Sequence, residues 1–237
     1  MQDPGTPHRR ETDARAIWRE GLDRYPESAL LKIKLGFTHL FVVMNGASAD
    51  PKGDIEQAWR YLEAASEKGM LSRFEAWHAH WLKAFLHQWR DNDFTRSVAD
   101  ARAAVALAPN DPLTRGDLSW VLANAGLGDE AAAWARTAIE GSVNPPLWLH
   151  GNLGWANYVA GRYREALEAS RGIEYVFAMR VAALVRLGET EAARAAVADY
   201  VRGRGWDTIA KEARYPQIEP DRTQFLDALR MAGFPES

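Results

Sequence analysis

Apolar residues recur at helical spacing along most of the chain, and turn residues divide the pattern into short segments. In residues 12–24 the apolar positions fall every four residues, which predicts a one-faced helix that ends before Pro26. The same reasoning predicts further helices over residues 29–44, 54–67, 72–89, 94–107, 174–187, 191–201 and 221–231, and helix pairs over 113–139 and 145–170. No segment alternates apolar and polar residues over the length of a strand. The pattern therefore predicts an all-α protein.

The pair over residues 145–170 carries small and turn residues in a fixed order. Leu153 and Gly154 are followed by Gly161, Tyr163 and Ala166. Gly154 and Ala166 are small enough for two antiparallel helices to approach closely, and Gly161 tolerates the positive φ that ends the first helix. This order and spacing is typical of a tetratricopeptide-repeat (TPR) helix-turn-helix unit.

Turn residues recur at nearly the TPR period, which is about 34 residues. Asn92, Gly126 and Gly161 follow one another at almost this period, whereas Gly188 comes sooner after Gly161 than the period requires. The short interval predicts that the helix after Tyr163 is cut by about two turns. We expect a TPR-like α-solenoid of about five helix-turn-helix units plus terminal helices. Arg180 occupies a position where leucine is usual, which predicts atypical packing in the last unit.

Composition and charge limit the classes of function. The net charge is −3 with acids and bases mixed, which argues against nucleic acid or an anionic membrane as a partner held by charge. Cysteine is absent, and the first residues lack the apolar core of a signal peptide. No apolar run is as long as a membrane span requires. We expect a cytoplasmic protein with a flexible leader over residues 1–11 and a single superhelical domain over 12–237.

Several phrases of the sequence resemble a known family. The stretches PESALLKIKLGFTHL, ALAPNDPLTRGDLSWVLANAG, NPPLWLHGNLGWANYVAGRYREAL and FLDALRMAGFPE are similar to the C-terminal TPR region of bacterial class III adenylate/guanylate cyclases. The resemblance extends over residues 12–236. It implies a regulatory or interaction arm of a signalling protein, carried behind a catalytic domain that this sequence does not contain. No cyclase catalytic residue is therefore carried over.

In a TPR superhelix the first helix of each pair lines the concave groove. Counting back from the turns predicts a set of partner-binding residues: Phe37, Leu82, Leu86, Trp89, Trp120, Asn124, Trp148, Trp155 and Tyr158. An aromatic residue recurs at one equivalent place, and aromatic rings make good binding anchors. We predict a groove for an extended peptide or an amphipathic helix of a protein partner. Alternatively, the ends of the superhelix fold inward and the rings pack against the chain's own helices.

Other residue groups predict no chemistry. His80 and His87 are seven positions apart, which is about 10.5 Å along a helix and too far to share a metal ion. No nucleophile has a base at a suitable position. We therefore expect no enzyme activity, no cofactor and no metal. The long turn over residues 45–53 either closes over one end of the groove or is a tolerated surface loop. Two other functions remain open: a self-association scaffold that forms a homodimer, or a closed groove that senses a small apolar ligand.

Overall fold

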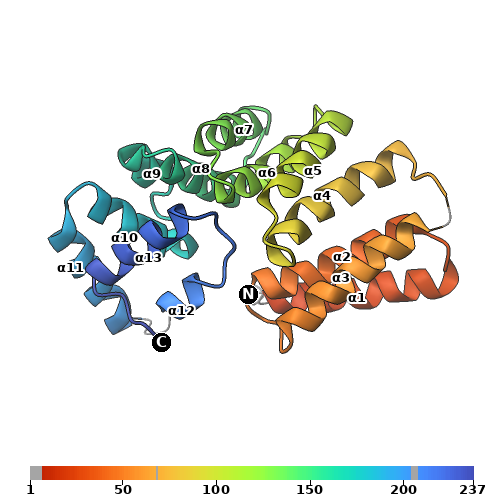
Figure 1. Ribbon diagram of the computed structural model, residues 1–237, viewed down its shortest axis with the longest axis horizontal. Coiled ribbons are helices and arrows are strands. Elements are labelled where there is room, and N and C mark those ends of the chain that lie inside the picture. The colour runs from red at the N-terminus through yellow and green to blue at the C-terminus, as the bar shows by residue number, and fades with distance from the viewer. Residues whose placement is uncertain (1–6, 68, 204–207) are drawn as a thin grey trace. The chain divides into compact units, whose positions relative to one another are not determined.

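A computed structural model of the protein describes residues 7–67, 69–203 and 208–237 (Figure 1). In that part of the chain short turns join successive helices and no strand occurs, which confirms the all-α prediction. The elements are α1 (Pro7–Arg24), α2 (Ala29–Met44), α3 (Pro51–Ser66), α4 (Arg73–Trp89), α5 (Phe94–Leu107), α6 (Pro112–Asn124), α7 (Gly128–Glu140), α8 (Leu147–Val159), α9 (Tyr163–Ala169), the 3₁₀ turn η1 (Glu174–Val176), α10 (Phe177–Arg186), α11 (Thr190–Gly203), α12 (Ile209–Glu212) and α13 (Asp221–Met231).

The chain divides into two compact units, Met1–Ala108 and Pro109–Ser237, and each is described by itself. The expectation of one continuous domain over 12–237 stays a prediction. Helix α1 begins at Pro7, inside the expected leader, and residues 1–6 lie outside the described residues. Among the helices described, none has the length and apolar character needed to cross a bilayer.

The first unit consists of α1 packed on α2, followed by the antiparallel pairs α2/α3 and α4/α5. Polar caps fix where these helices begin. The Ser28 hydroxyl accepts the backbone N–H of Leu31, and Ser72 forms a capping box with Glu75 at the start of α4, where the sequence predicted a helix start. Helix α3 begins earlier than predicted, because Asp50 caps it through a hydrogen bond from the Gly53 N–H.

The core of the first unit lies between α2, α3 and α4. Leu35, Leu62, Leu82 and Phe85 are almost completely buried there. Gly36 permits the close approach of α2 and α4, since a Cβ atom at this position would lie 2.6 Å from Cδ2 of Leu82.

The second unit consists of the antiparallel pairs α6/α7, α8/α9 and α10/α11, after which α13 packs on α10. Helix α12 is tied to the last residues of the chain, because the Ile209 N–H donates to the Pro235 carbonyl at 2.7 Å. Gly126, Gly161 and Gly188 end the first helix of each pair with φ of +78°, +75° and +81°. The turn positions expected from the sequence are therefore confirmed.

The α8/α9 pair has the tight contact that the sequence predicts. A Cβ atom at Gly154 would lie 3.3 Å from the Ala166 carbonyl oxygen, so only a very small residue fits without adjustment. Helix α9 is also short, with 7 residues where α7 has 13. The shortening inferred from the reduced interval between turn glycines is therefore confirmed.

Candidate interaction surfaces

Two aromatic residues of α8 form the centre of one candidate surface, in the second unit. The rings of Trp155 and Tyr158 are stacked with their centroids 5.5 Å apart and their planes inclined by 10°. The indole Nε1 of Trp155 donates a hydrogen bond of 2.9 Å to Oδ1 of Asn124, on α6. This bond fixes the orientation of the indole. We call Asn124, Trp155 and Tyr158 the aromatic face of the second unit.

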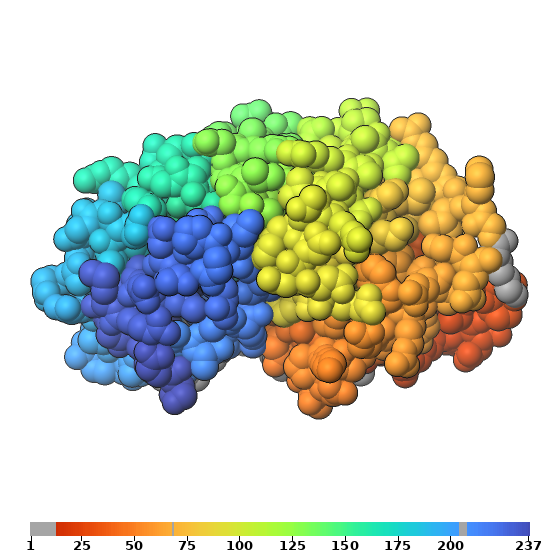
Figure 2. All heavy atoms as spheres, viewed as in Figure 1, coloured from red at the N-terminus to blue at the C-terminus, as the bar shows by residue number. Residues whose placement is uncertain are grey.

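The C-terminal segment, residues 208–237, covers this face. The ring of Phe225, on α13, makes edge contacts with Trp155 and Tyr158 at centroid distances of 5.2 and 5.7 Å. The Ile218 N–H donates to the backbone carbonyl of Asn124 at 2.8 Å. In Figure 2 the segment (blue) forms one continuous surface with neighbouring helices of the second unit (teal to cyan). Trp155 and Tyr158 are consequently only 8% and 7% exposed.

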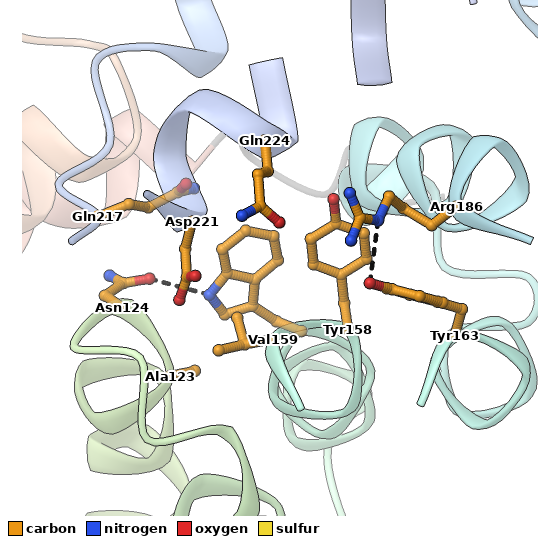
Figure 3. Close-up of a pocket in the computed structure, with 10 residues that line it drawn as sticks. Ala123, Asn124, Tyr158, Val159, Tyr163, Arg186, Gln217, Asp221 and Gln224 are labelled. Carbon is orange, nitrogen blue, oxygen red and sulfur yellow. Dashed lines mark hydrogen bonds between the residues drawn. The ribbon is translucent and has the colours of Figure 1, made fainter. Parts of the chain in front are cut away.

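A small pocket of about 40 Å³ remains beside the aromatic face (Figure 3). Asp221 and Gln224 reach it from α13, and Asn124 and Tyr158 from α6 and α8. Burial raises the pKa of Tyr158, and burial together with the charge of Glu219 raises the pKa of Asp221. The pocket has room for little more than water.

Trp120 also meets the C-terminal segment, since its ring lies 6.3 Å from that of Tyr215 in an edge-on arrangement. Trp148 is partly exposed at the start of α8. Of the predicted groove residues in this unit, Asn124, Trp155 and Tyr158 therefore come together, whereas Trp148 lies near the other end of α8. In this unit the C-terminal segment packs on the rings of Trp155 and Tyr158. This matches the alternative stated in the sequence analysis, in which an end of the chain folds inward. The contact of these rings with a partner stays a prediction.

The first unit carries its own row of aromatic rings, on α2 and α4. The Phe37 ring lies 5.8 Å from Phe41 and 5.6 Å from Trp81, and Trp81 stacks on Trp77 at 6.1 Å. Phe74, at the start of α4, extends the row and is about half exposed. The sequence reasoning selected Phe37 but missed Phe41, Trp77 and Trp81.

Leu82 and Leu86 require a correction. Both were predicted to line the groove, but neither has any exposed surface. Trp81, one residue before Leu82, contacts Phe37 instead. Helix α4 is apolar on most of its circumference, so periodicity alone does not decide between adjacent positions such as 81 and 82. Trp89, at the end of the same helix, is partly exposed.

The histidines of α4 are connected through α5 in a way that the sequence did not indicate. His80 Nδ1 lies 2.6 Å from one carboxylate oxygen of Asp100, and His87 Nε2 lies 3.2 Å from the other. One carboxylate thus joins two side chains that lie two helical turns apart. Within the described residues, no three His, Cys, Asp or Glu side chains are grouped as metal ligands.

The turn between α2 and α3 comprises residues 45–50, shorter than the expected 45–53, because α3 already begins at Pro51. Asp54, on α3, ties this turn to the core. The Ser48 hydroxyl donates to Oδ2 of Asp54 at 2.5 Å, and Nδ1 of His39 lies 2.5 Å from Oδ1. His39 lies on α2 and is buried, and its Nε2 has no hydrogen-bond partner in the described part of the chain. Asp54 therefore links the turn to α2.

We expect acidification from about pH 7 to about pH 5 to lower the free energy of unfolding through His39. Burial lowers the pKa of His39 below its ordinary 6.5, and this effect exceeds the opposing effect of the bond with Asp54. Protonation then begins in the unfolded chain at a higher pH than in the folded chain. The stability that neutral His39 contributes is present above pH 6.5 and is lost as the pH falls below it.

Urea unfolding at several pH values measures this effect. The decrease should be shallower in His39→Gln than in the wild type. Equal pH dependence in the wild type and His39→Gln would contradict the assignment.

Comparison with known proteins adds no relative: no model of a protein family matches the chain, and no curated protein is significantly similar to it.

Proposed function

We propose that the chain is a TPR-like α-solenoid that binds helical segments of a protein partner on its aromatic faces. The positive-φ glycines at the turns, the small residue at the α8/α9 contact and the near-regular spacing of the pairs support the repeat assignment. That the module serves as the regulatory arm of a signalling protein such as a class III cyclase rests on the sequence resemblance described above.

The docking of α13 is the observation that carries the proposal. An amphipathic helix lies on the aromatic face and inserts one ring, Phe225, against Trp155 and Tyr158. Leu226 and Leu229 of the same helix are also buried. This is the helix-in-groove mode of recognition, formed here within one chain. A partner helix with an aromatic anchor would use the same contacts when α13 is displaced.

A binding experiment in trans tests the proposal. A fluorescent peptide of residues 216–237 is titrated against the full chain carrying Phe225→Ala, in which the contact within the chain is weakened. We expect saturable binding, and we expect a further Trp155→Ala substitution to weaken it at least about tenfold, or about 1.4 kcal/mol, by removing the ring that Phe225 meets.

Trp59→Ala provides the matched control, because Trp59 packs against His87 in the first unit. It should leave peptide binding unchanged. Absence of saturable binding, or equal loss in the Trp155 and Trp59 variants, would contradict the proposal. Light scattering on the wild-type chain separates the self-association alternative: a dimer that disappears in Phe225→Ala would indicate that α13 exchanges between copies.

A further inference from the structure

A second surface of the second unit has a different chemistry. A groove of about 490 Å³ lies among α9, α10 and α11, whose positions Figure 1 shows. Apolar side chains of α10, among them Phe177, Val181 and Leu184, contribute to its lining. None of the three residues of the aromatic face contributes to it, so the two surfaces are separate.

The short α9 accounts for the groove. In the α6/α7 pair the second helix has 13 residues, whereas α9 ends after 7 residues. The chain leaves α9 through a turn with Gly172 at φ +76° and then begins the next pair. About two turns of helix that would otherwise lie beside α10 are therefore missing. A further helix can fill such a gap, since helix axes pack roughly 8–10 Å apart.

The charges around this groove are unusual for the chain. Arg164, Arg171 and Arg180 line it, together with Glu168 and Glu189. Elsewhere arginines are commonly paired with carboxylates, and several such pairs join neighbouring helical turns or helices. Among the described residues, the guanidinium groups of the three groove arginines make no ion pair and no hydrogen bond.

Arg180 is the groove arginine with a buried, unsatisfied donor among the described residues. It lies on α10 where a leucine is usual, and its Nε atom is buried without an acceptor in the described part of the chain. A buried donor left unsatisfied costs free energy. A carboxylate is the acceptor best matched to the guanidinium group, because it accepts two parallel N–H bonds.

We propose that this groove binds an amphipathic helix of a partner protein that carries a glutamate or aspartate in the middle of its apolar face. The apolar residues of the helix occupy the space left by the short α9, on the partly exposed Leu184 and Leu187. Its central carboxylate meets Arg180. With three arginines against two glutamates, the groove carries one positive charge in excess, which favours an acidic occupant.

Two designed peptides test this binding. Both are acetylated, amidated helices with leucine at heptad a and d positions; one has a single central glutamate on that face and the other has glutamine. The ¹H–¹⁵N signal of the Arg180 Nε–H group reports contact directly. We expect the glutamate peptide to shift this signal and to bind about tenfold more tightly than the glutamine peptide. Arg180→Leu should abolish that difference, whereas Arg60→Ala, an exposed arginine of α3, should preserve it.

The same variants distinguish a binding role of Arg180 from a structural one. Arg180→Leu should also raise the unfolding temperature, since it removes the unsatisfied donor; a lower unfolding temperature would make Arg180 a structural residue and overturn the proposal. Equal binding of the two peptides, or no shift of the Arg180 signal, would overturn it as well.

Decanoate bound as tightly as the glutamate peptide would assign the groove to an amphiphile instead of a helix. Trp155→Ala should leave this binding intact, which separates it from the aromatic face.

Discussion

Replacing Phe225 by alanine should release α13 from α8 and lower the free energy of unfolding of the second unit by about 3–5 kcal/mol. Phe225 is 2% exposed and contacts both rings of the aromatic face, so its removal leaves a cavity between α13 and α8. Urea unfolding followed by tryptophan fluorescence measures the loss. Hydrogen exchange at the amides of α13 shows whether this helix detaches first.

A control on the same helix separates the effect of the ring from that of helix propensity. Met231, near the end of α13, is 55% exposed. Met231→Ala should therefore change the free energy of unfolding by at most about 0.5 kcal/mol. If both substitutions cost the same, Phe225 does not anchor the segment. The aromatic face would then be covered for another reason.

Gly128→Ala should destabilise the second unit by about 1–3 kcal/mol, although alanine is the better helix former. A Cβ atom at Gly128 would lie 2.4 Å from the backbone nitrogen of Ala160 and 2.8 Å from its Cα. Backbone atoms do not move aside as the end of a side chain does, so α7 and the end of α8 would have to separate. Chemical denaturation of the variant measures the cost.

Gly154→Ala is the matched comparison, because the backbone atom nearest to an added Cβ there, the Ala166 carbonyl oxygen, lies 3.3 Å away and not 2.4 Å as at Gly128. The nearest atom to an added Cβ would be the flexible Cε of Met179, at 3.0 Å. The gain in helix propensity, about 1 kcal/mol, should offset much of the crowding, so the net change should be close to zero. Equal losses at the two glycines would contradict this interpretation of the contacts.

The order of the helices was predictable because local chemistry determines it. Ser28 and Ser72 accept backbone N–H groups at helix starts, and Gly126 and Gly161 adopt the positive φ that ends helices. Each of these signals acts within a few residues of the bond that it makes. Even the shortened α9 was visible, as a change in the spacing of turn glycines.

The side-chain contacts at the two aromatic surfaces were less predictable than the helices, for two physical reasons. On α4 most positions are apolar, so the sequence did not distinguish Leu82, which is buried, from Trp81, which meets Phe37. The contact of Phe225 with Trp155 joins residues that are far apart in the chain, and no local pattern specifies such a pairing. The contacts of Asp54 with Ser48 and His39 were not predictable for the same reason, since they depend on the path of the turn before α3.

The position of Phe225 in the chain has a consequence for synthesis. Tyr158 is made well before Phe225, the ring that covers it in the folded protein. Because the ribosome adds about 5–20 residues per second, an interval on the order of ten seconds or less separates the two. Until Phe225 is made, α13 cannot cover the rings of Trp155 and Tyr158. Newly made copies therefore pass through a state in which these rings are uncovered, and the duration of this state depends on the local rate of translation.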